Sequence, residues 1–314
     1  MERQRSMPQR IPPQRDESLA ADPLHFYAVP GDATDPRKYA SHLDALPTST
    51  PALCRVAQGL LIHILETWRY GVELPRERQA EVSIGTVEGL LKRILELDQQ
   101  PLTTQRAPER RVVATCHDFS ILLCAMLRRQ GRPARARAGF AAYLMPGKYT
   151  DHWVCQYWDG GAARWVTVDA QLDAAHLQGY GIAFDPCDVP AEQYLTGAHA
   201  WQECRAGRMD PHSFGFSRWS GMGYLRHVFL RDLLALNKSE GLPWEDAGLP
   251  VREESAITDE DRARLDELAA LALAGNGAFD CLYSAYEAVV SSGRPPDWWP
   301  WRLDDVQSLN LRYA

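Results

Sequence analysis

The run from Thr115 to Asp169 constrains the fold most, because a buried helix is followed there by three strand-like segments. Apolar side chains recur at the spacing of one helix face, at Phe119, Leu122, Leu123, Met126 and Leu127. Gly131 and Pro133 then end the pattern, as at a helix stop. At its start, Thr115 followed three residues later by Asp118 is a variant of the capping box with Asp in place of Glu. We therefore expect a core helix that begins at about Cys116.

Three segments rich in strand-forming residues follow this helix, at 134–144, 152–158 and 164–169. The last two are separated by Asp159-Gly160-Gly161-Ala162-Ala163, a sequence typical of a β-hairpin. A helix followed by antiparallel strands favours an α+β core.

Further helices are predicted on both sides of this core. The spacing of Leu53, Val56, Leu60, Leu61, Ile64 and Trp68 predicts a helix from about Pro51 to Tyr70, capped by Thr50, and a second helix is expected at about Gly85–Leu97. Past residue 185 the candidate helices are Pro190–Cys204, Tyr224–Asn237, Thr258–Ala274 and Phe279–Val290. The aromatic segment 298–301 is expected to pack on the body of the protein. We divide the chain into a flexible leader at 1–24, a core with N-terminal helices at 25–185, and a mainly helical extension at 186–314.

Charge and cysteine content exclude several classes of protein. The net charge of −7 argues against non-specific binding to nucleic acid or membrane, and no apolar run is long enough to span a bilayer. The N-terminus lacks the apolar core of a secretory signal. Seven scattered cysteines without a C-x-x-C pair indicate a reducing, cytoplasmic setting.

Cys116 differs from the other cysteines by its position. A thiol acts as a nucleophile when it is deprotonated, and the start of a helix favours the thiolate through its dipole and free N–H groups. Cys124 lies two turns further along the same helix, where neither effect reaches it. Cys116 is therefore the candidate nucleophile.

The hairpin supplies a candidate base and its partner. A loop of Gly160-Gly161, or one of four residues from Asp159 to Ala162, places His152 directly opposite Asp169. An Asp159-Gly160 turn makes the two diagonal neighbours that are still within reach. Asp169 can then fix one imidazole nitrogen and leave the other to face the thiol. Cys116, His152 and Asp169 are thus the predicted catalytic triad.

Three blocks at these residues resemble the transglutaminase-like superfamily: Thr115-Cys116-His117-Asp118-Phe119, Asp151-His152-Trp153 and Val168-Asp169. The blocks have the order and approximate spacing of that superfamily over roughly residues 112–172. The residues beside them resemble those of uncharacterised bacterial members. The resemblance implies a papain-like fold, with the Cys helix packed on an antiparallel sheet and additional helices on the N- and C-terminal sides. It implies that Cys116 forms a thioester while His152 moves the proton. The oxyanion would be held by the backbone N–H of Cys116 and a second donor that no motif identifies, although Trp or Gln serves in relatives. The Arg usual after the cysteine is His117 here.

Each residue of the predicted triad also has a non-catalytic interpretation. Cys116 could be a structural thiol, His152 a core histidine, and Asp169 a residue of a turn or a helix cap. The order and spacing of the three favour the triad. His117, Cys124 and His152 do not form a recognised metal spacing, so we predict neither a metal nor another cofactor. His117 and Trp153 are candidate substrate-binding residues, with His117 on the surface or the wall of the site. Arg135 and Arg137 could bind an acidic group, but a solvated strand face is the favoured reading.

The sequence is compatible with three functions. In an acyltransferase or amide-forming enzyme, an amine releases the acyl group from Cys116. In an amidase or protease, water does so. A non-catalytic binding module is disfavoured by the complete triad. The expected partners are a small-molecule or peptide acyl donor, with an amine or a carrier-bound acyl group as a further possibility. The excess of Arg over Lys, 30 to 4, hints at a GC-rich bacterial source and at secondary metabolism.

Overall fold

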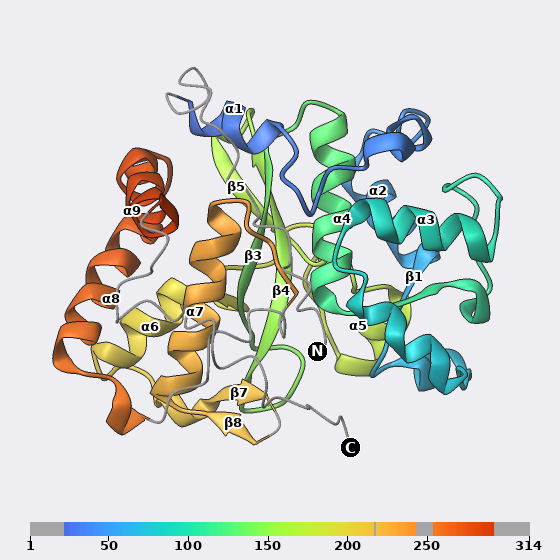
Figure 1. Ribbon diagram of the computed structural model, residues 1–314. Helices are drawn as coiled ribbons and strands as arrows, with labels where there is room; N and C mark the ends of the chain where they lie inside the picture. The colour runs from blue at the N-terminus through green and yellow to red at the C-terminus, as the bar shows by residue number, and fades with distance from the viewer. Residues whose placement is uncertain (1–21, 217, 243–253, 292–314) are drawn as a thin grey trace, which may run out of the picture.

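An antiparallel pair of strands, β3 and β4, runs through the middle of the molecule with helices on both sides (Figure 1). The structure is a computed structural model that describes residues 22–216, 218–242 and 254–291. The predicted leader at 1–24 lies almost wholly outside the described residues, and the aromatic segment at 298–301 lies entirely outside them.

The main sheet has six strands in the order β6-β3-β4-β7-β8, and β5 also pairs with β4. Their bounds are β3 Ala134–Ala141, β4 Tyr149–Asp159, β5 Arg164–Val168, β6 Tyr194–Thr196, β7 Phe214–Phe216 and β8 Trp219–Ser220. All pairs are antiparallel except β4 with β7. A separate two-stranded parallel sheet joins β1 (Leu61–His63) to β2 (Val112–Ala114).

Helix α4 lies against one side of the central strands, while α6 and α7 lie against the other (Figure 1). The α-helices are α1 Pro23–Ala28, α2 Thr50–Leu60, α3 Val87–Leu97, α4 Cys116–Arg129, α5 Ala174–Tyr180, α6 Gly197–Arg205, α7 Met222–Leu236, α8 Asp259–Leu273 and α9 Phe279–Ser291. Almost every residue of α4 is buried, because its apolar face and its flanks are both covered. The predicted α+β class is confirmed, with the helix that begins at Cys116 packed on an antiparallel sheet.

The helix predicted from Pro51 to Tyr70 is wrong in its second half. Helix α2 ends at Leu60, and the chain continues as β1, which pairs with β2 in parallel register. The N–H of Ile64 extends this pairing by donating to the carbonyl of Ala114 at 2.9 Å. A short apolar run fits a buried strand as well as a helix, and the pairing with a segment 50 residues away decides between them.

The register of the β4–β5 hairpin also differs from the prediction. Asp159 pairs with Arg164, so the loop is residues 160–163 rather than a Gly160-Gly161 turn. The Asp159 side chain holds this loop by accepting hydrogen bonds from two of its N–H groups, and Ala163 closes it with a positive φ of 50°. Asp169, directly after β5, is consequently a diagonal neighbour of His152 and does not lie opposite it.

The solvated strand face predicted at Arg135 and Arg137 is wrong, since both side chains are buried against the helices that cover β3. Arg137 makes a two-pronged ion pair with Asp232 of α7, with both N···O distances 2.7 Å. Arg135 donates to Gln156 at 2.9 Å and lies 3.9 Å from the ring centre of Trp165. These internal partners leave neither guanidinium free for an acidic substrate.

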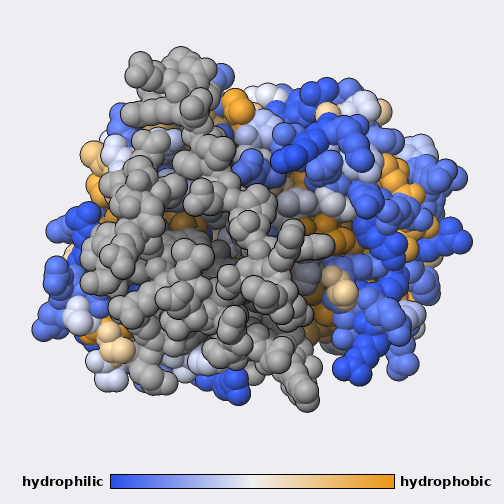
Figure 2. Space-filling view, in the orientation of Figure 1, coloured by the Kyte–Doolittle hydropathy of each residue, from blue (hydrophilic) through white to orange (hydrophobic). Residues whose placement is uncertain are grey.

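Within the described ranges, no helix combines the length and apolar character needed to cross a bilayer. Figure 2 shows the same side of the molecule as Figure 1, and the described surface around α3 is mainly hydrophilic there.

Candidate active site

Cys116 is held at the first position of α4 by its neighbours on both sides. The carboxylate of Asp118 accepts hydrogen bonds from the Thr115 N–H at 2.8 Å and from the Thr115 hydroxyl at 3.1 Å, as the capping-box variant predicts. Strand β2, which leads into the helix, is fixed by a hydrogen bond of 2.8 Å from the Val113 N–H to the buried carboxylate of Glu81. The backbone therefore enters the helix at a fixed place, with Cys116 in the first turn, where the N–H groups have no partner within the helix.

The structure brings His152 and Asp169 together. His152 Nε2 and Asp169 Oδ2 are 2.8 Å apart, and both side chains are buried. Oδ2 also accepts a hydrogen bond of 2.7 Å from the hydroxyl of Tyr143, while Oδ1 accepts one of 3.0 Å from the N–H of Gln171. Asp169 thus has its orientation fixed by three donors, and it leaves Nδ1 of His152 for the contact with Cys116.

The charges of this pair stabilise each other. Burial alone would lower the pKa of His152, but the Asp169 carboxylate and the contact with Cys116 raise that pKa well above its ordinary value. Burial likewise opposes ionisation of Asp169, yet the charge of His152 and hydrogen bonds from His152 and Tyr143 lower the pKa of Asp169. The favoured state near neutral pH is an imidazolium bound to a carboxylate.

The Cys116 thiol is correspondingly acidic. Burial would raise its pKa, but the contacts with His152 and His63 outweigh burial and lower the pKa of Cys116 to about 6. Elsewhere in α4, Cys124 lies 3.3 Å from the sulfur of Cys155 in the core, and burial raises the pKa of Cys155 well above its ordinary value. The lowered pKa of Cys116 therefore distinguishes it from the core thiol of Cys155.

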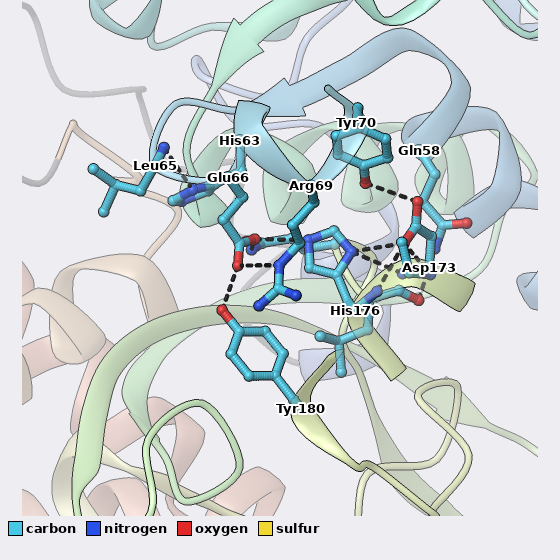
Figure 3. A network of polar contacts seen from close by, with 12 residues as sticks. Gln58, His63, Leu65, Glu66, Arg69, Tyr70, Asp173, His176 and Tyr180 are labelled. Carbon is cyan, nitrogen blue, oxygen red and sulfur yellow. Dashed lines mark hydrogen bonds and ion pairs between the residues drawn. The ribbon is translucent and has the colours of Figure 1, made fainter. Parts of the chain in front are cut away.

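His63 is a neighbour of the thiol that the sequence did not reveal. It ends β1 and pairs with Ala114, two residues before Cys116. Its Nδ1 accepts a hydrogen bond of 3.3 Å from the N–H of Leu65 (Figure 3). A helix predicted through this position hides the relation, because only the β1–β2 pairing brings His63 to the start of α4.

A polar cluster around Glu66 adjoins His63 and is drawn in Figure 3. The buried carboxylate of Glu66 accepts hydrogen bonds from His176 at 2.6 Å, from Gln171 at 2.8 Å and from Arg69 at 3.1 Å, and it also accepts one from the hydroxyl of Tyr180. This convergence of donors outweighs burial and lowers the pKa of Glu66. Two segments far apart in sequence, 63–70 and 171–180, are thereby tied together.

His176 is the centre of this cluster. Its second ring nitrogen lies 2.7 Å from Asp173, whose other carboxylate oxygen accepts a hydrogen bond of 2.7 Å from Tyr70. Although burial opposes its charge, contacts with Asp173 and Glu66 raise the pKa of His176 to about 9. Since Gln171 bonds both Glu66 and Asp169, the cluster reaches the candidate triad through one residue.

The structure does not bring His117 and Trp153 to a surface that a substrate could reach. His117 is fully buried, and its Nε2 lies 3.1 Å from the carbonyl oxygen of Glu240. Trp153 is also buried, and its ring meets that of His117 edge-on at 4.9 Å between centres. As the residue after Cys116 on a helix, His117 points away from the thiol. Its full burial contradicts the surface, one of the two positions expected for it, and the wall of the site stays a prediction.

A pocket of about 690 Å³ that opens to the surface lies beyond Tyr143, and neither His152 nor Asp169 is among the residues that line it. Its lining includes Tyr143, Tyr180, Ile182, Phe184 and Glu192. Tyr143 connects it to the triad, because its hydroxyl bonds Asp169 and its ring lies edge-on to that of His152 at 6.1 Å. The volume is in the range of small-molecule sites.

Comparisons with known proteins agree with the motif. Residues 96–170 match the model of the transglutaminase-like superfamily. No curated protein matches the sequence. Among solved structures, one from Cytophaga hutchinsonii named as a "putative cysteine protease" is similar at 17% identity and a TM-score of 0.31, over 55% of this chain and 45% of that one. The chain thus spans less than half of that protein.

Proposed function

We propose, from the premise that residues 96–170 belong to the transglutaminase-like superfamily, that the chain catalyses acyl transfer from an amide or thioester through Cys116, His152 and Asp169. The observation that carries the proposal is the acidic thiol of Cys116, with a pKa of about 6, next to the buried His152–Asp169 pair. This combination keeps a nucleophile and a proton donor side by side at neutral pH.

In the first step, the Cys116 thiolate attacks the carbonyl carbon and the new S–C bond forms. The bond to the leaving amine or thiol breaks as His152 gives its proton to that group, which leaves a thioester on Cys116 and neutral His152. Asp169 holds the imidazole in orientation throughout, through the 2.8 Å contact at Nε2.

In the second step, an incoming amine attacks the thioester and gives its proton to His152, which restores the thiolate and the imidazolium. Water in the same position would give hydrolysis, the alternative reaction of the same residues. The burial of His152, at 2% exposed, keeps bulk solvent from the base in both reactions. We extend the proposal to a small-molecule donor or acceptor, because a pocket of about 690 Å³ adjoins Asp169 through Tyr143. We extend it to bacterial secondary metabolism because Arg outnumbers Lys by 30 to 4.

The test is acylation of the protein by p-nitrophenyl acetate, followed by intact-mass and peptide analysis. We expect one acetyl group on Cys116, lost in Cys116→Ala and kept in two controls, the buried Cys124→Ala and the exposed Cys281→Ala. Acetyl groups spread evenly over the cysteines would contradict the proposal.

A second measurement separates the two reactions. The acetylated protein is mixed with a primary amine over a range of concentrations, and amide and acetate are quantified. An amide yield that rises with amine concentration supports transfer, whereas acetate alone at all concentrations identifies a hydrolase.

A further inference from the structure

His63 and His152 approach Cys116 from two different sheets. His152 belongs to β4 of the main sheet, whereas His63 ends β1 of the two-stranded parallel sheet. The β1–β2 register sets His63 level with Ala114, and the hydrogen bond of 2.9 Å from the Ile64 N–H to the Ala114 carbonyl fixes that register. The nucleophile therefore has two imidazole neighbours, and the proposed mechanism uses one of them.

The hydrogen bonds of His63 determine which of its nitrogens can donate. Nδ1 accepts from the N–H of Leu65, so a neutral His63 carries its proton on Nε2. The side chain of His63 also faces the Cys116 thiol and lowers its pKa, and Nε2–H is the donor available on that side of the ring. Leu65 precedes Glu66, whose carboxylate is anchored by His176 and Gln171, so the turn that orients His63 is itself held.

We propose that His63 is the second oxyanion donor of the active site, acting through Nε2–H beside the backbone N–H of Cys116. This assignment rests on the proposed acyl transfer. When the thiolate attacks a carbonyl, its negative charge moves from sulfur to the carbonyl oxygen as the S–C bond forms. A donor that bonds the thiolate beforehand is then next to the atom that becomes charged. The charge returns to the leaving group when the tetrahedral intermediate collapses, and His63 keeps its proton throughout.

The two histidines consequently have separate tasks. His152 bonds Asp169 through Nε2 and must give its proton to the leaving group, so it cannot also hold the oxyanion. His63 lies near Glu66, which is already bonded to His176, Gln171, Arg69 and Tyr180 through both of its oxygens. No hydrogen bond between His63 and a carboxylate occurs among the described side chains, unlike the arrangement at His152. His63 is placed as a fixed donor, and His152 as the proton carrier.

Two reactions of the same thiol separate an oxyanion donor from other roles. Acylation by p-nitrophenyl acetate passes through an oxyanion, whereas alkylation by iodoacetamide attacks a saturated carbon and does not. Both rates are measured at about pH 9, where the thiolate is formed, for wild type, His63→Ala, His63→Gln and the exposed control His42→Gln. We expect His63→Ala to lower acylation by about 10²-fold or more while alkylation changes by less than about threefold. His63→Gln, which keeps an N–H donor, should recover part of the loss.

The proposal is overturned if acylation and alkylation fall by the same factor in His63→Ala, since His63 then acts on the thiolate or on the fold. It is also overturned if neither rate falls. The proposed acyl transfer fails separately: wild-type protein would then show no acylation of Cys116 in the first measurement, before any variant is compared.

Discussion

Replacing Asp169 by Asn tests whether the charge behind His152 sets the reactivity of Cys116. Asp169→Asn keeps the size of the side chain but removes the carboxylate that lies 2.8 Å from His152 Nε2. Burial disfavours the charged imidazole, and Asp169 is the largest influence that opposes it. The variant should therefore lower the pKa of His152, and the Cys116 thiolate should lose its charged neighbour.

The size of the effect follows from the pKa of Cys116, which is about 6 against an ordinary value of 9.0. An opposite charge within about 4–6 Å typically shifts a pKa by about 1–3 units. The midpoint of the Cys116 titration should therefore rise from about 6 to between about 7 and 9. At pH 6 the thiolate fraction falls from about one half to about a tenth or less. A more basic thiolate is also a better nucleophile, with a Brønsted slope of about 0.45, so the alkylation rate at pH 6 falls only about 2- to 20-fold.

The midpoint is therefore a better measure than a single rate. We would follow iodoacetamide labelling of the Cys116 peptide by mass spectrometry between about pH 4.5 and 9.5, in wild type, Asp169→Asn and the control Asp188→Asn. Asp188 makes an exposed ion pair with Arg164 at 3.0 Å and should leave the profile unchanged. A midpoint for Asp169→Asn that coincides with the wild-type value would refute the coupling between Asp169 and Cys116.

Three further predictions concern stability. Asp232→Asn leaves the buried charge of Arg137 without its carboxylate and should lower the free energy of unfolding in urea by about 3–5 kcal/mol; a loss under about 1 kcal/mol, as at an exposed pair, would contradict this. Gly139→Ala would drive a Cβ into a backbone carbonyl of β6 and should lower the melting temperature; an unchanged value would show that β6 moves freely. The pKa of Glu66 is lowered in the folded protein, so this carboxylate stabilises the fold above its unfolded pKa of about 4.5. The pKa of His176 is raised to about 9, so this imidazolium stabilises the fold fully below its unfolded pKa of about 6.5 and loses the effect as pH rises through about 9. The free energy of unfolding in urea should thus be greatest between about pH 4.5 and 6.5, and Glu66→Gln should flatten its dependence on pH on both sides of that range. A free energy of unfolding that does not change with pH in the wild type would contradict the stabilising role of this pair.

The parts of the site that depend on neighbouring residues could be predicted from the sequence. The start of α4 follows from the cap formed by Thr115 and Asp118 and from the spacing of apolar residues. The proximity of His152 and Asp169 follows from a hairpin with few possible loops. The exact register does not, because it depends on how Asp159 bonds the loop and on the positive φ of Ala163, for which the sequence gives no strong signal.

The parts that depend on distant pairing could not be predicted in this way. His63 reaches Cys116 only because β1 pairs with β2, and the apolar run that contains β1 fits a helix equally well. Arg135 and Arg137 alternate with small residues as a solvated face would, but α7 covers that face and supplies Asp232. In both cases the partner is a segment 50 or more residues away, which a local pattern does not identify.

These distant contacts hold β4 and the candidate active site from two directions. On the α7 side, Tyr224 and Arg231 each donate to Asp151 at 2.7 Å, directly before His152 in β4. On the other side, the Glu66 cluster reaches Asp169 through Gln171. Burying so many charged groups costs free energy unless each is paired, so the clusters add little net stability. What they supply is a fixed position for each end of the His152–Asp169 contact, and His152 is in turn one of the groups that lower the pKa of Cys116.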